Sequence, residues 1–495
     1  MERAERAVDG VVVGHGESVP LAVWPIGHDI PVMGDEEQRY RNRSLWLDGL
    51  AGRLTPRPSL GGDADYDVCI VGAGFTGLWT AYSLVVAQPD LRVIVLEHEI
   101  AGFGASGRNG GWVSAGIAGV AARYAKRAGR EAVVRAERAT FEAVDEIGRV
   151  VAAEGIDCGF HKGGVLMVAS DAAQQARLRK LVDQRHALGW GHDDVRLLDP
   201  DERAARPNVA GTVEASFSPH GARVDPARLV RGLAEACERR GVRISEKTTV
   251  SRIEPGIVRT SRGMVGADHV VRATEAFTIA LTGEARRYLP LYSLMIATEP
   301  LPDDAFADLR WDGGETIADL RHLFFYAQRT TDNRIAIGGR GAPYRLGSPL
   351  NPAYERMPKV RERLERTVRE RFPQAAGARI THHWGGPLGV PRDWCMAIAY
   401  DRETGVGSAG GYGGHGVVAA SISGRTMADL ILGRDTDLTT LPWVGHRQRN
   451  WEPEPLRFIA SRAIVGILGS ADRIEPRLGH TARRVRLVAP FMPPR

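Results

Sequence analysis

Three glycine-rich stretches contain the residue types that can bind a phosphate-bearing cofactor, and the first is the most regular. Gly72-Ala73-Gly74-Phe75-Thr76-Gly77 has a GxGxxG spacing, and Glu97 follows twenty residues after its last glycine. Such glycines permit a tight turn and a close approach of the backbone to a pyrophosphate, while the later carboxylate can bind ribose hydroxyls. The pattern therefore predicts a dinucleotide site, and the alternative is a glycine turn that serves structure alone.

The second stretch, residues 102–112, holds five glycines together with a serine, an arginine and an asparagine. A segment so rich in glycine exposes backbone N–H groups to phosphates and allows a flat ring to lie against the chain. Enzymes that use a nicotinamide dinucleotide do not need a second glycine loop at this point of the sequence. The stretch therefore favours a flavin dinucleotide, and a flexible surface loop is the alternative.

The third stretch, residues 410–416, precedes a segment with an apolar face, residues 417–432, that we expect to be a helix. The N-terminus of a helix presents free N–H groups and the positive end of the helix dipole, so it attracts negative charge. We expect this stretch to lie at the flavin edge that becomes negative on reduction. A plain helix start is the alternative.

The elements that must position these stretches alternate between strands and helices. Residues 67–71, 76–86 and 92–96 predict a strand, a helix and a strand, which is one βαβ unit. Further helices are expected over 121–153, 172–188 and 225–240, the last with Asp225 as its N-cap and Pro226 as its first residue. Further strands are expected over 164–169, 242–244, 269–273, 291–298, 323–327 and 334–338. This is an α/β fold class, with a Rossmann-type domain and more strands than that domain needs.

Composition limits the class of protein. The chain has 495 residues, 43% hydrophobic and 25% charged, which is ordinary globular usage for two or three domains. No apolar run approaches the ~20 residues of a membrane span, and the N-terminus lacks the apolar stretch of a signal peptide. The four cysteines are far apart and have no histidine at ligand spacing. We therefore expect a cytoplasmic protein without a metal site.

The net charge of +5 is concentrated in the tail, residues 441–495, where ten arginines stand against four acidic residues. An arginine-rich tail can bind nucleic acid or an anionic membrane surface. This tail has no recognisable nucleic-acid motif, and apolar residues such as Trp451 and Phe458 alternate with its arginines. We expect it to pack along the body of the protein or against another subunit, so that a homo-oligomer is possible and nucleic acid is not a partner.

Together these motifs resemble a known family. The glycine stretches, the segment 225–230, the strands 247–250 and 270–274 and the GGYGGHGV ending occur in the order seen in the D-amino acid oxidase-like FAD-dependent oxidoreductases. The resemblance spans roughly residues 67–441. With the flanking SLWLD and 451–457 segments, the chain is most similar to the γ-glutamylputrescine oxidase-like and aminophosphonate oxidoreductase-like members.

The resemblance implies FAD as the cofactor and a C–N bond of a primary or secondary amine as the site of oxidation. Hydride would pass to flavin N5, the imine would hydrolyse, and oxygen would be the acceptor, giving hydrogen peroxide. Two alternatives stay open: an amine or amino acid dehydrogenase that passes electrons to a carrier, and a flavoprotein without catalytic turnover. Some relatives bind flavin through a cysteine after a Trp-Gly segment, but residues 384–391 contain none. We therefore expect non-covalent FAD.

The resemblance also assigns residues. The expected FAD-binding residues are Gly72, Ala73, Gly74, Phe75, Thr76, Gly77, Glu97, Gly104, Ala105, Ser106, Gly107, Arg108, Asn109, Gly110, Gly111, Trp112, Val250, Ala273, Thr274, Gly413, Gly414, His415, Gly416 and Val417. The expected catalytic or substrate-facing residues are His415, Tyr326 and Arg329, with Tyr292, Met295 and Arg392 as further candidates for the pocket wall. Tyr292 and Met295 could equally be core residues, and the arginines could equally be solvated.

Two departures from the family pattern bear on the reaction. Amino acid oxidising relatives place a carboxylate-binding arginine within the segment that matches 384–391, whereas here the nearest is Arg392. Sarcosine oxidase-like members have an oxygen-activating lysine on the strand that matches 333–339. This strand has no lysine, and Arg334 and Arg340 are the cations beside it. A simple α-amino acid substrate and fast oxygen chemistry are therefore less expected.

The expected domains follow from the motifs. Residues 1–61 form an N-terminal extension, and 441–495 form the basic tail. The FAD-binding domain is discontinuous and comprises 62–160, 212–290 and 378–440. The substrate domain comprises 161–211 and 291–377 and is built on a largely antiparallel sheet.

Overall fold

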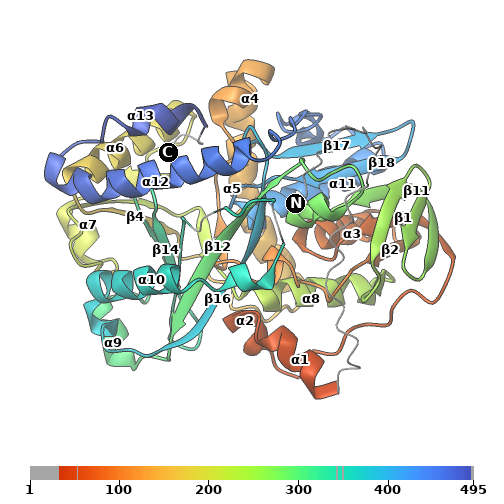
Figure 1. The fold of residues 1–495 in the computed structure, drawn as a ribbon, viewed down its shortest axis with the longest axis horizontal. Helices are drawn as coiled ribbons and strands as arrows, with labels where there is room; N and C mark the ends of the chain where they lie inside the picture. Colours follow the sequence, from red (N-terminus) through yellow and green to blue (C-terminus); the bar gives the residue numbers. More distant parts are fainter. Residues whose placement is uncertain (1–32, 53, 342–343, 348–349, 492–495) are drawn as a thin grey trace, which may run out of the picture.

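Two β-sheets, each packed against helices, form the two halves of the molecule (Figure 1). The computed structural model describes residues 33–52, 54–341, 344–347 and 350–491, so most of the expected N-terminal extension lies outside the described residues. In the described part of the chain, no helix combines the length and the apolar character that crossing a membrane requires. The α/β fold class expected from the sequence is confirmed.

The first sheet has a parallel centre, in the order β17-β18-β11-β1-β2-β8, with β9 and β10 added beside β11. Strand β1 pairs in parallel with both β2 and β11. Val68 and Ile70 of β1 pack beneath the helices, whereas Cys69 and Val71 face the β9–β10 hairpin. Burial of both faces explains the continuous apolar run in the sequence. The strands are β1 (Ala64–Val71), β2 (Val93–Leu96), β8 (Arg243–Ser245), β9 (Val250–Glu254), β10 (Ile257–Thr260), β11 (Gly263–Arg272), β17 (Ala397–Asp401) and β18 (Val406–Gly410).

Three helices pack on this sheet: α3 (Phe75–Ala87), α8 (Pro226–Arg239) and α11 (Gly416–Ile431). Gly424 lets α11 approach α3 closely, because a Cβ atom there would lie 2.6 Å from the backbone nitrogen of Thr80. The predicted cap of α8 is confirmed, since Asp225 Oδ1 accepts hydrogen bonds from the N–H groups of Ala227 (2.9 Å) and Arg228 (3.0 Å).

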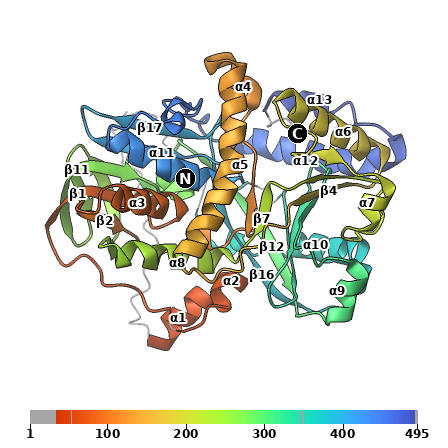
Figure 2. The ribbon, with the colours of Figure 1, turned by 180° about the vertical axis from the view of Figure 1, so that it is seen from behind.

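The expected helix over 121–153 is two helices, α4 (Ala121–Ala128) and α5 (Arg130–Ala153). Gly129 separates them with a φ of +85°, a backbone conformation that glycine adopts without the clash of a side chain. Figure 2 shows α5 running along the junction between the two halves. The expectation of one continuous helix was therefore wrong at this glycine.

The second sheet is largely antiparallel, as expected, in the order β16-β12-β15-β14-β13-β4-β6-β5, and only β13 and β4 pair in parallel. Helices α9 (Asp303–Leu309) and α10 (Pro358–Arg371) complete a core with Phe306, Trp311 and Phe372. The strands are β4 (Val165–Ala169), β5 (Arg196–Leu197), β6 (Glu214–Ser218), β12 (Leu289–Thr298), β13 (Thr316–Asp319), β14 (Phe325–Arg329), β15 (Ile335–Gly339) and β16 (Ile380–Val390).

Two of these strands correct the expected domain boundaries. Strand β6 pairs with β4, and β16 pairs with β12 along nearly its whole length. Both therefore belong to the second sheet, although the expected segments 212–290 and 378–440 assign them to the cofactor domain. Long-range strand pairing, which local periodicity does not reveal, places the boundaries after each of these strands.

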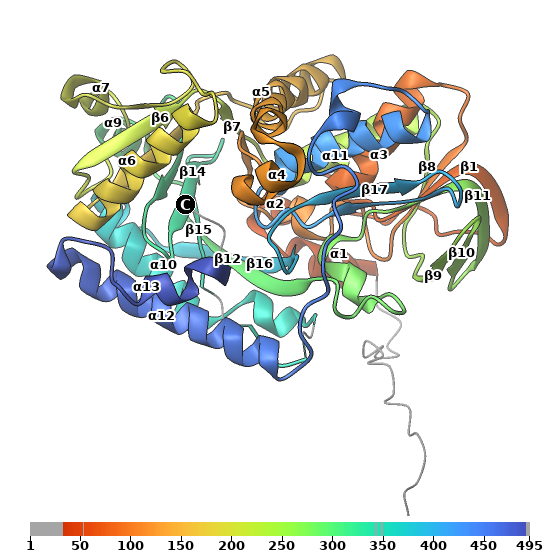
Figure 3. The same ribbon diagram turned by 90° about the horizontal axis from the view of Figure 1, so that it is seen from above.

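The basic tail packs along the body. Helix α12 (Leu456–Leu478) crosses the second half beside α6 (Ala172–Ala187), as Figures 1 and 3 show. Glu475 of α12 forms an ion pair with Arg177 (2.7 Å) and a hydrogen bond with His322 Nε2 (2.9 Å). The remaining elements are α1 (Met33–Arg41), α2 (Leu45–Asp48), α7 (Pro200–Ala204), α13 (Val485–Val488), β3 (Trp112–Ser114), β7 (Gly221–Arg223) and the short 3-10 helices η1 (Ala105–Gly107), η2 (Glu275–Ala280), η3 (Pro352–Glu355), η4 (Pro373–Ala375), η5 (Asp437–Thr440) and η6 (Ala489–Phe491).

Candidate functional site

Residues from both sheets line one cavity of about 1860 Å³. All three glycine stretches reach it, although the first and the third lie more than three hundred residues apart in the sequence. The predicted residues that line it are Gly72, Gly74, Phe75, Thr76, Glu97, Gly104, Ala105, Ser106, Arg108, Asn109, Gly110, Trp112, Val250, Ala273, Thr274, Tyr326, Gly413, Gly414, His415, Gly416 and Val417. Ala73, Gly77, Gly107 and Gly111 belong to the same turns but do not line the cavity.

The first glycine stretch forms the turn between β1 and α3. Gly72 has a φ of +107°, and a Cβ atom there would lie 2.6 Å from the carbonyl oxygen of Ala273. Gly77 packs its Cα against the turn, because a Cβ atom would overlap the carbonyl oxygen of Gly72. Gly74 is the N-cap of α3, so the first N–H groups of this helix lie at the cavity. This arrangement suits an anion such as a pyrophosphate.

Glu97 lies at the end of β2, beside the same turn. Its carboxylate accepts hydrogen bonds from the N–H groups of Ala73 (2.9 Å) and Glu99 (3.0 Å). Burial raises the pKa of Glu97 to about 7, even though these two N–H donors act in the opposite direction. The side chain lines the cavity together with Val250. A carboxylate held in this way can accept hydrogen bonds from ribose hydroxyls.

The second stretch is joined to the first by a side chain. Ser106 Oγ accepts a hydrogen bond from the N–H of Phe75 at 2.9 Å. Asn109 stabilises the loop from within, because its Nδ2 donates to the carbonyls of Ala105 and Ser106 and its Oδ1 accepts from the N–H of Gly111. The loop is therefore part of the cavity wall and is held by its own hydrogen bonds, which argues against the alternative of a flexible surface loop.

Four side chains from outside the loop bind its backbone oxygens in succession. Ser44 Oγ donates to the carbonyl of Gly107 (3.1 Å), and Trp384 Nε1 donates to that of Arg108 (3.0 Å). The carbonyl of Asn109 accepts from Trp46 Nε1 (2.8 Å), and that of Gly110 from Gln328 Nε2 (2.7 Å). Sequence reasoning missed these contacts. Donors from three elements, α2 with its N-cap Ser44, β14 and β16, thus hold the backbone of the loop.

Arg108 is buried and lines the cavity, but its guanidinium has a protein partner. It forms an ion pair with Glu355 at 2.8 Å, and Glu355 also pairs with Arg43 at 2.8 Å. Arg108 Nη1 donates further to the carbonyl of Gly385. The side chain therefore ties the second glycine stretch to the second sheet.

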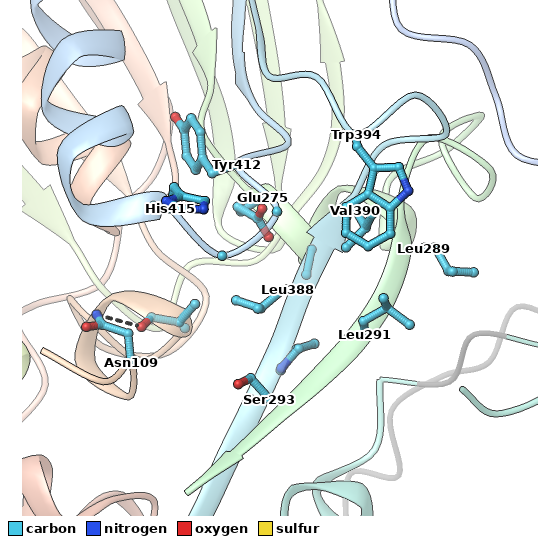
Figure 4. Close-up of a pocket in the computed structure, with 18 of the residues that line it drawn as sticks. Asn109, Glu275, Leu289, Leu291, Ser293, Leu388, Val390, Trp394, Tyr412 and His415 are labelled. Carbon is cyan, nitrogen blue, oxygen red and sulfur yellow. Dashed lines mark hydrogen bonds between the residues drawn. The ribbon is translucent and has the colours of Figure 1, made fainter. Parts of the chain in front are cut away.

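The third stretch also borders the cavity, where α11 begins at Gly416 with His415 as its N-cap. Tyr412 connects this end to α3, since its hydroxyl lies 2.7 Å from Thr76 Oγ1. Figure 4 shows His415 and Tyr412 on one side of the cavity, with Glu275 close to them. The N-terminus of α11 thus faces the space that the other two glycine stretches enclose.

Glu275 is a cavity residue that sequence reasoning missed. Its Oε2 accepts a hydrogen bond from the N–H of Gly389 at 2.6 Å, and its backbone has a φ of +43°. Burial raises the pKa of Glu275 to about 7 against the effect of backbone N–H donors. The sequence signal was weak: a single carboxylate directly after Thr274, which was itself predicted to line the cofactor.

Tyr326 lies where the second glycine stretch meets β14. Its ring contacts Trp112 edge-on at 6.1 Å between centroids, and its hydroxyl lies 2.8 Å from Ser293 Oγ. A Cβ atom on Gly110 would lie 2.7 Å from this ring, so glycine is required there. Burial raises the pKa of Tyr326, so its hydroxyl stays protonated.

Arg329 does not reach the cavity. It pairs with Asp312 at 2.6 Å, donates to Asn333 Oδ1 and the carbonyl of Trp311, and lies over the ring of Phe306. Arg329 is the last residue of β14, three positions after Tyr326, so the alternation of side chains along a strand directs the two to opposite faces of the sheet. The structure therefore does not support the expected catalytic role of Arg329.

Of the other predicted wall residues, Tyr292 and Arg392 line the cavity and Met295 does not. Tyr292 lines the cavity and accepts a hydrogen bond from the N–H of Asn351 at 3.0 Å, whereas Met295 is a core residue. Arg392 lines the cavity, but it pairs with Glu452 at 2.8 Å and lies over the ring of Trp451. The charge of Arg392 is therefore largely balanced within the protein.

Comparison with known proteins agrees with this geometry. Residues 67–430 match the DAO family, described as FAD dependent oxidoreductase. The gamma-glutamylputrescine oxidoreductase of Escherichia coli K12 is 31% identical over 392 residues, which cover 77% of this chain and 87% of that protein. The probable oxidoreductase OrdL of Haemophilus influenzae is 29% identical over 384 residues, covering 75% and 84%.

Solved structures show the same fold. The crystal structure of glycine oxidase from Geobacillus kaustophilus superposes with a TM-score of 0.65 at 19% identity, covering 78% of this chain and all of that one. The family match covers well over half of the sequence, and the E. coli relative aligns over most of both chains. This chain belongs to the DAO family of FAD-dependent oxidoreductases.

Proposed function

We propose that this FAD-dependent oxidoreductase oxidises a C–N bond of a primary or secondary amine. When bound, FAD supplies a hydride acceptor, and water then hydrolyses the imine product. The observation that carries the proposal is the single cavity in which three glycine stretches meet a wall of aromatic and apolar side chains. The names of the E. coli relative and of the glycine oxidase, which denote amine or amino acid substrates, support it.

The cavity residues fit FAD. The turn at Gly72, where a Cβ atom would meet the backbone, and the N-terminus of α3 form a cradle for the pyrophosphate. Glu97 and Val250 are suited to the adenosine end. The segment from Ser106 to Trp112 and the stretch from Gly413 to Val417, with Ala273 and Thr274, are suited to the flavin. We propose these residues as the cofactor site, and the absence of a cysteine from the cavity wall supports non-covalent binding.

The substrate region lies beside β12 and β16. Figure 4 shows Leu291, Leu388 and Val390 around this part of the cavity, with Trp394 above them. An apolar wall of this kind would exclude water from the reacting C–N bond during hydride transfer. Tyr326, whose hydroxyl is held by Ser293, would orient the amine near Trp112.

Two side chains near the N-terminus of α11, His415 and Glu275, can influence the electrostatic potential in this part of the cavity. The N-terminus of α11 favours negative charge, and His415 stands at that terminus. The Glu275 carboxyl, with a pKa of about 7, exchanges a proton near neutral pH. We propose that His415 and Glu275 set the charge of this end of the cavity and thereby the reduction potential of the bound flavin.

Oxygen is the proposed electron acceptor, with hydrogen peroxide as the product. A dehydrogenase is the second candidate, because β15 (Ile335–Gly339) carries no lysine that could activate oxygen. Arg334 cannot substitute, since it pairs with Asp332 (2.6 Å) and donates to the carbonyl of Thr298 outside the cavity. Arg340, the other cation beside this strand, does line the cavity.

The test is anaerobic reduction followed by exposure to air. A panel of primary and secondary amines is mixed with the oxidised protein without oxygen, and absorbance near 450 nm reports flavin reduction. We expect at least one amine to bleach the flavin, whereas alcohols of the same carbon skeleton leave it oxidised. Recolouring in air within the turnover time supports an oxidase, and slow recolouring that an artificial acceptor accelerates supports a dehydrogenase. A flavin that no amine reduces contradicts the proposal.

A further inference from the structure

The cavity is lined by six arginines, and most of them are balanced by a carboxylate. Four form ion pairs at 2.8–2.9 Å: Arg108 with Glu355, Arg185 with Glu137, Arg392 with Glu452 and Arg457 with Glu454. The remaining two are Arg130 and Arg340. Arg130 is exposed at the rim, where it donates to the carbonyl of Ala187. Arg340 is therefore the exception inside the cavity.

Arg340 follows the last residue of β15 and lies between two aromatic rings. Its guanidinium carbon is 5.1 Å from the ring centroid of Phe324 and 5.7 Å from that of Trp394. Among the described residues, no carboxylate lies within ion-pair distance of it, and burial lowers the pKa of Arg340 to about 10. A guanidinium that stacks on aromatic faces keeps its N–H edge available for a planar, two-pronged bond to an oxyanion.

A chain of ring contacts connects Arg340 to the cofactor loop. Phe324 contacts Tyr326 at 6.2 Å between centroids, and Tyr326 contacts Trp112 of the second glycine stretch at 6.1 Å. Two aromatic side chains thus separate Arg340 from Trp112 along one wall of the cavity. A ligand whose amine lies near Trp112 could extend along this wall and place a second group at Arg340.

Removing a charge from water costs several kcal/mol unless an opposite charge or hydrogen bonds compensate. The four paired arginines receive this compensation from the protein, but Arg340 does not. We propose that Arg340 binds an oxyanion of the substrate, so that the substrate is an amine bearing a carboxylate or a phosphonate at a distance from the oxidised C–N bond. This inference rests on the proposed amine oxidation and names the class of amine.

The test uses the FAD-loaded enzyme and matched ligands. Three amine series of equal chain length, n-alkylamines, ω-amino carboxylic acids and ω-amino phosphonic acids, are compared for the rate of anaerobic flavin reduction. Binding of the corresponding alkyl carboxylates and alkyl phosphonates, which lack the amine and cannot reduce flavin, is measured by calorimetry. We expect the preferred anionic amine to have at least a tenfold higher reduction rate at low concentration than the alkylamine of its length. The two acid series then distinguish a carboxylate from a phosphonate substrate.

Substitutions of Arg340 test whether this side chain causes the preference for anionic amines. In Arg340→Gln we expect the advantage of the anionic amine to fall at least tenfold and the binding of its amine-free analogue to be lost, whereas alkylamine oxidation is retained. Arg340→Lys should recover part of the binding, since it keeps the charge but loses the planar fork. Arg130→Gln is the matched control and should behave like the parent.

The outcomes separate this inference from the proposed function. If alkylamines and anionic amines reduce the flavin equally and no amine-free acid binds, Arg340 is not an anion site, although amine oxidation stands. If no amine reduces the flavin, the proposed function fails, and the calorimetric comparison of parent with Arg340→Gln still decides whether the anion site exists. If Arg340→Gln does not fold, Arg340→Lys and the matched ligand pairs on the parent decide the question.

Discussion

Ser106 Oγ lies 2.9 Å from the backbone nitrogen of Phe75 and accepts its hydrogen bond. This contact joins the second glycine stretch to the first turn of α3, where Gly74 is an N-cap without a side chain to serve the helix. One hydroxyl therefore performs for α3 the function that a capping residue normally performs from within the same turn. The two motifs form one structural unit at the proposed pyrophosphate site.

Ser106→Ala should weaken FAD binding by about 1 kcal/mol, the usual scale of a lost helix cap, or roughly fivefold in Kd. The N–H of Phe75 loses its acceptor, and the loop loses its link to α3. Titration of the apoprotein with FAD, followed by flavin fluorescence, measures the change. Ser251→Ala, in the exposed strand β9, is the control. An unchanged Kd in Ser106→Ala would show that the cap does not support the cofactor site.

Glu97→Ala should weaken FAD retention by roughly 1.5–3 kcal/mol, the scale of a charge-assisted hydrogen bond to ribose. The variant also removes the acceptor for the N–H groups of Ala73 and Glu99. Gly74→Val should be worse, because its Cβ would start 3.0 Å from Ser106 Oγ and extend toward the pyrophosphate. Equilibrium dialysis against FAD measures both, with Glu254→Gln on β9 as a control. If both variants retain FAD as well as the parent does, this turn is not part of the cofactor site.

The flavin should be bound without a covalent link. Cys69, Cys158, Cys237 and Cys395 are all buried, and none of them lines the cavity. Acid precipitation of the yellow holoenzyme should therefore leave the colour in the supernatant. Flavin absorbance that stays with the washed precipitate would contradict this.

The stability of the apoprotein should fall as the pH rises from about 4.5 to about 7. Burial raises the pKa values of Glu97 and Glu275 to about 7, from an unfolded value near 4.5. In this window the folded chain binds more protons than the unfolded chain, so the stabilisation present below pH 4.5 is lost as each carboxyl ionises. The loss is on the order of 3 kcal/mol for each group.

Denaturant unfolding of the apoprotein at a series of pH values measures this slope. Glu275→Gln should reduce the slope, because an amide has no proton to lose, and Glu97→Gln together with Glu275→Gln should remove most of it. Glu299→Gln, at an exposed ion pair with Arg379, is the control. A pH slope that is the same in Glu275→Gln as in the parent would show that Glu275 ionises normally.

Glu475→Gln should loosen the tail helix α12. Burial alone would raise the pKa of Glu475, but hydrogen bonds from His322, the N–H of Ala482 and Arg177 lower it to about 2. The depressed pKa means that this contribution to stability is present above about pH 4.5 and is lost as the pH falls toward 2. Breaking such a buried pair costs about 3–5 kcal/mol.

Limited proteolysis at neutral pH checks this expectation, because an undocked α12 exposes its arginines to trypsin. We expect faster cleavage within residues 456–478 in Glu475→Gln than in the parent. Glu370→Gln, at an exposed pair on α10, should cleave like the parent. Equal cleavage in all three proteins would mean that other contacts hold the tail.

The cofactor half of the molecule was predictable because its signals are local. The turn at Gly72 and the helix start at Asp225 are settled by residues within a few positions, and the βαβ unit is complete within Ala64–Leu96. The break at Gly129 was missed, since helical spacing continues on both sides of a glycine whose φ is positive. Strands β6 and β16 were placed in the wrong domain, because their partners lie far away in the sequence.

The sequence by itself determined the cofactor class, since three glycine stretches of defined spacing leave few alternatives to FAD. Only the tertiary structure decided which charged side chains face the cavity. Arg329 and Arg392 look alike in the sequence to Arg340, but they meet Asp312 and Glu452 in the folded chain. Arg340 meets aromatic rings instead. Whether the charge of a buried side chain is balanced depends on the groups that distant segments bring next to it. The local sequence pattern does not show which groups these are.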